Sequence, residues 1–241
     1  MTDLGLITYF LGMEVNQNED GIFMSKQAFA LKVLSKFSMS KCKPADTPVA
    51  LGEKLSSTSE HDRVDEKGYR SLVGCLLYLT ATRPDIIYAV GLLSRFMHCC
   101  NVAHFKAVKR VLRYVKGTLS FGVKFERAEE LRLAGYSDSD WAGSVDDIKS
   151  TSGYFFTLGS DVFSWSSKKQ QIVAQSTAEA EYIAAATTVN QVIWLRKLLD
   201  DLNAGQPEAT KIKVGNQSVV ASAKNLCFMA RLSISRSNTI L

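Results

Sequence analysis

Hydrophobic and polar residues alternate with a strand-like period in the C-terminal half of the chain. The segment 131–140 begins with apolar residues and ends in the carboxylates of Asp138 and Asp140, a pattern typical of a central strand whose end opens into a site. Segments 153–158 and 162–166 are rich in aromatic and β-branched residues and are separated by a short polar stretch. This pattern predicts three antiparallel strands, two of them joined by a tight hairpin.

A long helix is expected after residue 176. Ser176 and Glu179 have the spacing of a capping box, and apolar residues then recur at helical spacing. The residues expected to face the core are Ile183, Ala186, Val189, Ile193, Leu198 and Leu202. Glu181 lies two residues after Glu179, about 200° around the helix, so one glutamate serves as a cap and Glu181 is available for chemistry. Segments 211–214 and 217–224 predict a further strand and a second helix.

The N-terminal half predicts a hairpin followed by helices. Apolar segments 6–15 and 22–24 flank a turn signal at 16–21, and an amphipathic helix is expected over 25–37. The polar, unpatterned segment 56–66 favours a linker or mobile loop. Helical periodicity returns in three later segments, 69–79, 84–97 and 104–116.

The last of these predicted helices carries a basic face beside an apolar one. Its five positive side chains recur at helical spacing and are Lys106, Lys109, Arg110, Arg113 and Lys116. Such a face is commonly the solvated side of a helix that packs on a core. Five like charges repel each other, however, and the face is easier to explain if phosphates neutralise part of this charge. Lys168, Lys169 and Gln170 are a second candidate phosphate contact, for which a solvated loop is the alternative.

The composition is that of a globular protein. With 241 residues, 46% of them hydrophobic, the chain allows one large domain or two small ones. A net charge of +5 favours a polyanionic partner without requiring one. Five cysteines without a C-x-x-C pair indicate reduced thiols in an intracellular protein, cytoplasmic or nuclear, and the His and Cys residues of 98–104 match no usual zinc spacing. No apolar run approaches the roughly 18 residues of a membrane helix, so a soluble protein is expected.

Five short motifs occur in a fixed order between residues 136 and 218. They are Tyr-Ser-Asp-Ser-Asp-Trp-Ala-Gly at 136–143, Lys-Ser-Thr-Ser-Gly-Tyr at 149–154, Trp-Ser-Ser-Lys-Lys-Gln at 165–170, Ser-Thr-Ala-Glu-Ala-Glu-Tyr at 176–182 and Asn-Gln-Ser at 216–218. Together they resemble the ribonuclease H domain of copia-type retrotransposon polyproteins. The resemblance implies an α/β domain with a ribonuclease-H-like mixed sheet and flanking helices. It also implies metal-dependent hydrolysis of the RNA strand in an RNA/DNA hybrid.

The resemblance extends to the preceding segments. Residues 1–55 resemble the palm and thumb tail of the copia-type reverse transcriptase, and 67–126 resemble the helical connection to the nuclease, across a linker at 56–66. The family's polymerase aspartates lie upstream, so polymerase activity is not implied. The implied partners are an RNA/DNA hybrid or other nucleic acid and the upstream polymerase portion, with no membrane. The ribonuclease-H-like domain would occupy 127–241, truncated at its C-terminus. There 232–239 shows little helical periodicity and is expected to fray, because no segment after it can pack on it.

The resemblance implies acidic ligands for two Mg²⁺ ions, for which Mn²⁺ can substitute. The family's motifs place the first ligand on Asp138, with Asp140 as the alternative, and the second on Glu181. Where the family has a third aspartate, this chain has Gly215, and 229–236 contains none of the acidic residues expected there. These departures imply a degenerate nuclease with impaired metal binding. The alternatives are a non-catalytic nucleic-acid-binding module and a pseudogene product.

Overall fold

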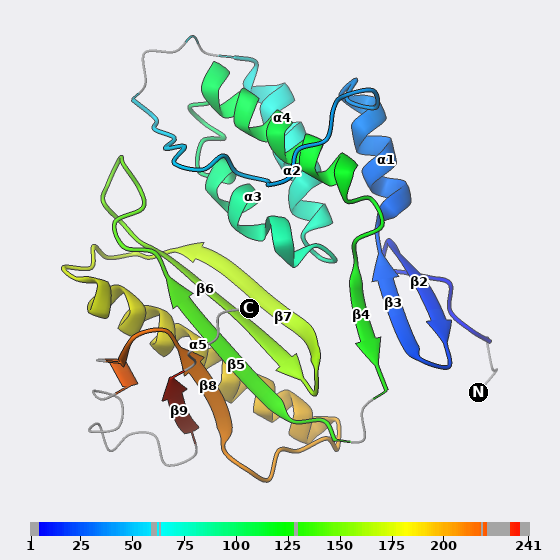
Figure 1. Ribbon diagram of the computed structural model, residues 1–241, viewed down its shortest axis with the longest axis vertical. Coiled ribbons are helices and arrows are strands. Elements are labelled where there is room, and N and C mark those ends of the chain that lie inside the picture. Colours follow the sequence, from blue (N-terminus) through cyan, green and yellow to red (C-terminus); the bar gives the residue numbers. More distant parts are fainter. Residues whose placement is uncertain are drawn as a thin grey trace. The chain divides into compact units, whose positions relative to one another are not determined.

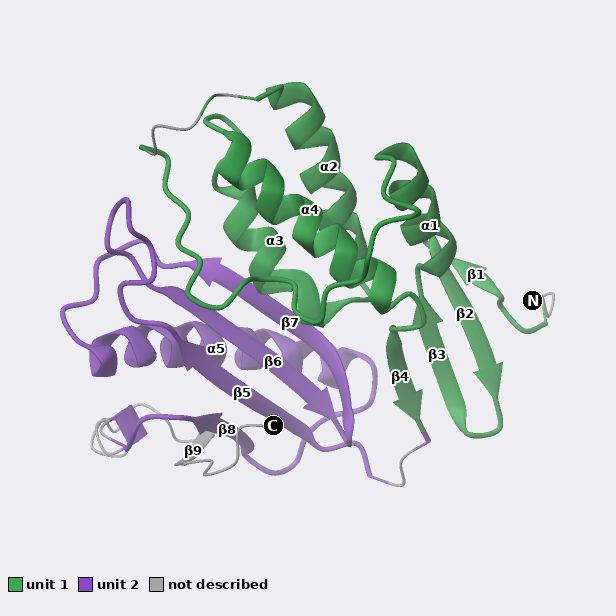
Figure 2. Ribbon diagram, turned by 45° about the horizontal axis from the view of Figure 1, so that its top comes forward, with its two compact units in different colours: residues 1–126 green, residues 127–241 purple. Residues whose placement is uncertain are grey.

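The chain forms two compact units, residues 1–126 and 127–241 (Figure 2). A computed structural model describes residues 5–58, 62, 64–127, 130–217, 219, 220 and 232–236, the last segment as backbone alone. Each unit has its own β-sheet (Figure 1). Each also has its own hydrophobic core. The described residues therefore contain five α-helices and two sheets, one antiparallel and one mixed.

The first unit combines an antiparallel sheet with a group of helices. Its described elements are β1 (Tyr9–Phe10), β2 (Met13–Asn18), β3 (Gly21–Ser25), α1 (Gln27–Lys36), α2 (Glu66–Leu79), the 3₁₀ helix η1 (Pro84–Ile86), α3 (Ile87–Ser94), α4 (Val102–Gly117) and β4 (Val123–Glu126). The strand order is β1-β2-β3-β4. β4 thus returns, after all the helices, to pair with β3. Residues from both sides of segment 56–66 contribute to a single core.

The predicted N-terminal hairpin is present, but its turn is shorter than expected. β2 continues to Asn18, which pairs with Gly21 across Glu19 and Asp20. The Asn18 side chain closes the turn by accepting hydrogen bonds from the backbone N–H groups of Asp20 and Gly21, at 3.1 and 3.0 Å. Gly21 is required there because its φ is +148° and an added Cβ would lie 2.0 Å from the carbonyl oxygen of Phe125.

The helices of the first unit form where the apolar periodicity predicts them. α1 and α4 match the predicted segments to within two residues at each end. The helix expected over 84–97 instead opens as η1 and ends at Ser94. α2 starts after Asp65, whose carboxylate accepts hydrogen bonds from two N–H groups of the first turn. α4 starts after Asn101, whose side chain forms a capping box with that of His104.

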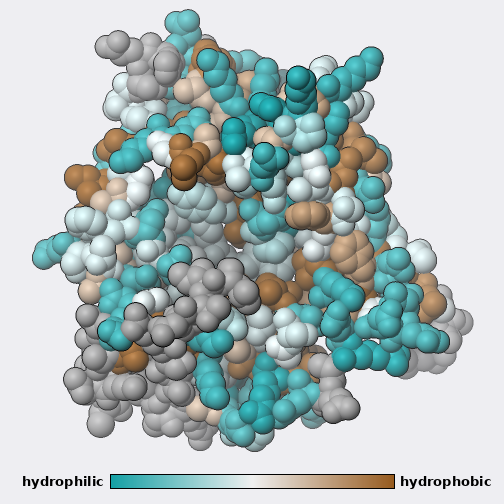
Figure 3. All heavy atoms as spheres, in the orientation of Figure 1, coloured by the Kyte–Doolittle hydropathy of each residue, from teal (hydrophilic) through white to brown (hydrophobic). Residues whose placement is uncertain are grey.

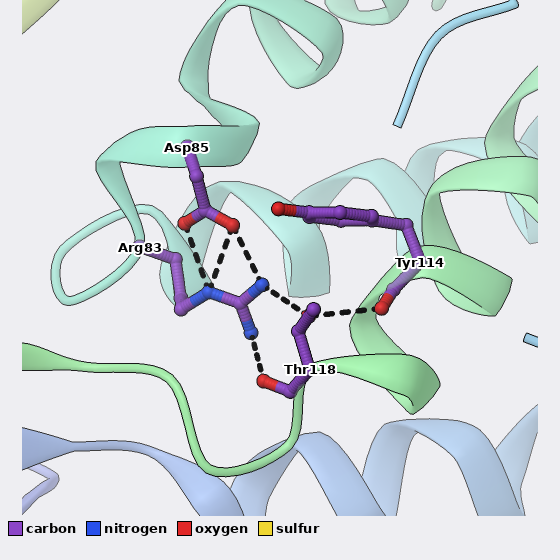
Figure 4. A network of polar contacts seen from close by, with 4 residues as sticks. All are labelled: Arg83, Asp85, Tyr114 and Thr118. Carbon is purple, nitrogen blue, oxygen red and sulfur yellow. Dashed lines mark hydrogen bonds and ion pairs between the residues drawn. The ribbon is translucent and has the colours of Figure 1, made fainter. Parts of the chain in front are cut away.

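A buried arginine fastens the start of η1 to the end of α4 (Figure 4). Arg83 is only 3% exposed, and its Nη2 lies 2.7 Å from Oδ2 of Asp85. The guanidinium also donates to the carbonyl oxygen and the hydroxyl of Thr118, at 3.0 and 2.6 Å. The rings of Tyr114 and Phe121 lie 5.7 and 5.4 Å from its central carbon. This charge is buried with partners on several sides, which is the condition under which burial of an arginine is tolerated.

The second unit is a five-stranded mixed sheet with a long helix. Its described elements are β5 (Leu133–Ser139), β6 (Thr151–Leu158), β7 (Asp161–Lys169), α5 (Thr177–Asp201), β8 (Thr210–Val214) and β9 (Leu232–Arg236). The strand order is β7-β6-β5-β8-β9, and α5 packs against β5, β6 and β8 (Figure 1). β5, β6 and β7 are antiparallel, as predicted. β8 runs parallel to β5, and β9 runs parallel to β8.

The sequence predicted the position of α5 but not the face that it buries. Of the residues expected in the core, Ile193, Leu198 and Leu202 are 45%, 39% and 66% exposed. The residues that are buried are Ala180, Ala184, Ala185, Thr188, Val192, Leu195 and Leu199. α5 carries apolar side chains on more than one side, so two helical spacings fit the pattern. The face rich in alanine turns inward, because small side chains allow the helix to lie close to the strands.

The end of the chain differs from expectation. The helix predicted at 217–224 lies largely outside the described residues. Residues 232–239 are expected to fray, whereas Leu232–Arg236 forms β9, which pairs with the preceding strand β8 from Thr210 to Val214. The segment reads Leu-Ser-Ile-Ser-Arg, an alternation with the period of a strand. The open edge of β8 supplies its backbone partners, and a search for helical periodicity does not reveal this.

Hydrophobic and hydrophilic side chains are interspersed on the face shown in Figure 3. The longest described helix, α5, has 25 residues and carries charged side chains near both ends. Within the ranges that the structure describes, no helix is both long and apolar enough to cross a membrane.

Candidate active site

Two carboxylates predicted as metal ligands come together at the end of β5. Asp138 is the next-to-last residue of β5 and is exposed, and Glu181 lies in the second turn of α5. The position of Glu181 follows from the start of the helix, because Oγ of Ser176 accepts a hydrogen bond from the N–H of Glu179 at 3.2 Å. Asp138 and Glu181 are close enough for the charge of one to affect the ionisation of the other.

Glu181 is a carboxylate that the fold leaves partly unsatisfied. Its Oε2 is buried and has no hydrogen-bond partner among the described residues. Burial and, second, the charge of Asp138 raise the pKa of Glu181 to about 7, and the backbone N–H of Ser139 offsets part of this rise. A buried carboxyl oxygen without a donor is costly. Such groups occur preferentially at functional sites, where a ligand or cation completes them.

Gly215 occupies the third position of the implied ligand set. It follows β8 directly, and Val214 at the end of β8 pairs with Ser137 of β5, so Gly215 lies beside Asp138 at the same edge of the sheet. A Cβ added to Gly215 would lie 3.7 Å from Oε1 of Glu181, an ordinary van der Waals distance. Three chain positions therefore converge as the family pattern implies, and one of them has no side chain.

Asp140, the alternative first ligand, has a local structural role. One of its carboxylate oxygens accepts a hydrogen bond from the backbone N–H of Thr151. The other oxygen packs over Gly143, where an added Cβ would lie only 2.2 Å from it. Asp140 thus closes the loop between β5 and β6, whereas Asp138 is exposed and lies near Glu181.

Two other polar residues near the site act as caps. Oε2 of Glu179 accepts a hydrogen bond from the N–H of Gln175 at 2.7 Å, one residue earlier than the Ser176 N–H of a strict capping box. Oδ1 of Asn216 accepts a bond from the N–H of Val219 at 3.4 Å. The carboxylate of Glu179 is therefore committed to the backbone, in agreement with the division of roles predicted for the two glutamates of this helix.

A buried glutamine beside the site was not anticipated. Gln170 follows β7 and is only 6% exposed, so the expectation that it meets phosphate or solvent is wrong. Its Nε2 lies 3.2 Å from Oγ of Ser139, 2.9 Å from Oγ of Ser152 and 2.9 Å from the carbonyl oxygen of Ala180. Its location at the end of a strand motif was the only signal in the sequence. Neighbouring lysines made the segment look like a surface loop.

Three of the five basic side chains on α4 bind the protein's own backbone. Arg110, Arg113 and Lys116 donate hydrogen bonds to the segment between α1 and α2. Their acceptors are, in that order, the carbonyl oxygens of Thr47 (3.2 Å), Lys43 (2.8 Å) and Ser40. Carbonyl oxygens thus relieve part of the charge repulsion that suggested phosphate binding.

The remaining candidate phosphate contacts are of two kinds. Lys106 and Lys109 on α4 and Lys168 on β7 are exposed. Lys169 instead forms an ion pair, with its Nζ 2.7 Å from Oδ1 of Asp147. The exposed lysines are therefore better placed than the other basic residues to meet a polyanion.

The side chains present suit one small divalent cation and not two. Across the described ranges, no group of three or more His, Cys, Asp or Glu side chains is placed to hold a metal ion. In segment 98–104, His104 is fully buried, and its Nδ1 accepts a hydrogen bond from the N–H of Asn101 at 3.2 Å. Asp138 and Glu181 remain, and Mg²⁺ is commonly held by one or two carboxylates with water completing its shell.

Comparison with known proteins places the chain among transposon polyproteins, although no family model matches it. It is 41% identical over 224 residues to the retrovirus-related Pol polyprotein from transposon RE1 of Arabidopsis thaliana. It is 40% identical over 240 residues to the one from transposon TNT 1-94 of Nicotiana tabacum. An uncharacterised mitochondrial protein of Arabidopsis thaliana is 43% identical over 195 residues, which is 80% of each chain.

The protein has two α/β units, and one of them carries a pair of carboxylates at the end of its central strand. Together with the similarities above, these features identify it as a retrotransposon-derived protein. The chain belongs to the family of copia-type retrotransposon Pol polyproteins. The two polyprotein matches cover 93% and 96% of this chain but only 15% and 18% of the polyproteins.

Proposed function

We propose that residues 127–241 are a ribonuclease-H-like unit whose nuclease activity is degenerate. The family reaction is metal-dependent hydrolysis of the RNA strand in an RNA/DNA hybrid. Support comes from the strand order β7-β6-β5-β8-β9 and from the five motifs. Four of them overlap β5, β6, β7 and the start of α5, and the fifth begins two residues after the end of β8. We further propose that residues 1–126 derive from the reverse transcriptase tail and its connection to the nuclease.

One observation carries the proposal of degeneracy, namely Gly215 beside Glu181. Two-metal hydrolysis needs enough carboxylates to hold both ions about 4 Å apart. Asp138 and Glu181 would hold one Mg²⁺, which supplies Lewis-acid polarisation and lowers the pKa of bound water. A second ion would have Asp138 as its single carboxylate ligand. Loss of one well-aimed electrostatic group commonly reduces a rate by about 10²–10³, so cleavage by the unmodified chain is expected to be at least that much slower than by a complete site.

The protonation of Glu181 weakens even the first site. Its pKa of about 7 leaves the carboxyl partly protonated at neutral pH, and a metal must displace that proton to bind. Asp138 is exposed and therefore accessible to an approaching cation. We therefore expect metal binding that is weak and that strengthens as the pH rises above 7.

The test is a nuclease assay of the full chain on an RNA/DNA hybrid with Mg²⁺ or Mn²⁺. Gly215→Asp is expected to produce slow, Mn²⁺-assisted cleavage, because a Cβ at this position meets Glu181 at ordinary contact distance and the substitution adds a carboxylate to the set. Gly215→Asn is the matched control, with similar size and no charge, and is expected to remain inactive. Robust Mg²⁺-dependent cleavage by the unmodified chain, abolished by Asp138→Asn, would overturn the proposal.

Non-catalytic binding of nucleic acid is the second candidate function. The exposed Lys106, Lys109 and Lys168 and the net charge of +5 favour it. Because Arg110, Arg113 and Lys116 are held by backbone carbonyls, we expect weak binding with few phosphate contacts. Hybrid would be preferred to plain DNA only if contacts to 2′-hydroxyls persist. Titration of labelled hybrid and of labelled DNA at several salt concentrations measures both the number of phosphate contacts and any preference for hybrid.

A further inference from the structure

We infer that Gln170 is a positioning residue that fixes the two carboxylates, Asp138 and Glu181, relative to each other. The inference rests on the proposed function, because it assigns a role within the same metal site. Two of the three atoms that Gln170 Nε2 contacts belong to the residues next to these carboxylates in the chain. Ser139 follows Asp138 on β5, and Ala180 precedes Glu181 on α5. One amide group therefore joins the strand and the helix at the point where each presents its carboxylate.

The hydrogen-bond pattern fixes the orientation of this amide. The carbonyl oxygen of Ala180 only accepts hydrogen bonds, so the nitrogen of Gln170 and not its oxygen must face it. The hydroxyl of Ser139 donates to the carbonyl oxygen of Asp140 at 2.8 Å and is left to accept from Gln170. The two N–H bonds of the amide thus serve three acceptors on β5, β6 and α5. A flipped amide would place two oxygens, its own and that of Ala180, against each other.

The buried amide of Gln170 carries a free-energy cost, which indicates that this residue does more than stabilise the fold. Oε1 of Gln170 is buried, and none of the described residues donates a hydrogen bond to it. A buried acceptor left unpaired destabilises the folded state. An apolar side chain of similar length would fill the space without this cost, but it would not tie Ser139 to Ala180. Residues that orient metal ligands typically change metal affinity by about 10–100-fold when altered.

A second glutamine provides a matched control at the opposite end of β5. Oε1 of Gln206 accepts a hydrogen bond from the N–H of Leu133 at 2.9 Å. Its Nε2 donates to the carbonyl oxygens of Leu131 and Ala204, at 2.9 and 3.1 Å. Gln206 thus fastens the start of β5 as Gln170 fastens its end, but it contacts neither carboxylate nor their neighbours in the chain. A merely structural role for Gln170 predicts that both substitutions act alike.

The experiment measures the affinity for Mn²⁺ by calorimetric titration of the full chain, in the unmodified and the Gly215→Asp backgrounds. Gln170→Met is expected to lower Mn²⁺ affinity about tenfold or more, while Gln206→Met leaves it within twofold, even if both lower the melting temperature. Ser139→Ala, a milder change that removes one acceptor of Gln170, is expected to lower affinity severalfold and keeps the test valid if Gln170→Met does not fold.

The possible failures are distinguishable. If the parent chains bind Mn²⁺, Asp138→Asn abolishes binding, and the Gln170 and Ser139 variants bind as the parents do, the positioning role is refuted and the metal site stands. If Gln170→Met and Gln206→Met reduce affinity equally, Gln170 acts only through general stability and the inference is again wrong. If neither parent binds Mn²⁺ in a way that depends on Asp138, the proposed function fails, and the positioning role fails with it.

Discussion

The two units bury an ionisable group in opposite ways. In the first unit, Arg83 is paired with Asp85 and bonded twice to Thr118, and it lies near the ring of Tyr114 (Figure 4) and that of Phe121. In the second unit, Glu181 has one buried oxygen without a partner in the described structure and a neighbour, Asp138, of the same charge. A charge that only holds a fold together is surrounded by complementary groups. A carboxylate pair that repels itself is expected where a cation is to bind.

The largest expected effect comes from breaking the complete network. Arg83→Met removes the clamp between η1 and α4 and leaves Asp85 without its partner, so the free energy of unfolding is expected to fall by about 3–5 kcal/mol. The control is Lys124→Met, which breaks an exposed pair with Glu126 and is expected to cost less than about 1 kcal/mol. Urea unfolding followed by circular dichroism measures both. Equal costs would contradict the view that Arg83 is a structural charge.

The effect of neutralising Glu181 should be smaller and opposite in sign. Because its folded-state pKa is about 7, above the ordinary 4.5, its contribution to stability is greatest below pH 4.5 and is lost as the pH rises through 7. Glu181→Gln, which carries no charge, is therefore expected to be more stable than the parent at pH 8 by roughly 1–2 kcal/mol, after allowance for partial solvent exposure. At pH 4 the difference should vanish.

Urea unfolding at the two pH values tests this, with Glu179→Gln as the control. Glu179 lies on the same helix, but it accepts a backbone hydrogen bond at the helix start, so its substitution should not stabilise the protein at pH 8. Destabilisation of the chain by Glu181→Gln at pH 8 would show that the carboxylate has a favourable partner.

The smallest expected effect separates partnered from exposed charges on α4. Each phosphate contact contributes roughly −0.9 to the slope of log affinity against log salt on B-form duplex. Lys109→Met should make the slope for nucleic-acid binding shallower by about that amount, because Lys109 is exposed. Arg113→Met should leave the slope unchanged, because Arg113 binds the carbonyl oxygen of Lys43. The slope is measured for each variant by fluorescence anisotropy with labelled hybrid at several salt concentrations. Equal changes in slope for both variants would refute the distinction between partnered and exposed charges.

Local signals predicted much of the fold. The hairpin between β6 and β7, the cap at Ser176 and the start of α4 follow from turn residues, capping residues and periodicity within short windows. The buried face of α5 could not be predicted from such local signals. Ile193 and Val192 are both apolar, and which of them is buried depends on how the helix packs on the sheet. β9 was missed for a related reason, since its partner β8 lies about twenty residues earlier in the chain.

Only those positions of the candidate site that belong to the family's motifs were predicted from the sequence. The motifs indicated Asp138, Glu181 and the absent side chain at Gly215, and the structure brings these three positions together. The environment of each residue depends on distant segments. Arg110 and Arg113 look like phosphate ligands until Thr47 and Lys43 are found beside them, and the burial of Gln170 depends on β6 and α5 together.

Gly215 has a consequence for how this site can change over generations. Its backbone conformation is one that residues with side chains readily adopt, and the space beside it accepts a Cβ at ordinary contact distance. Some glycine codons become aspartate codons through substitution of one base. An acidic side chain at this position would therefore require no rearrangement of the backbone.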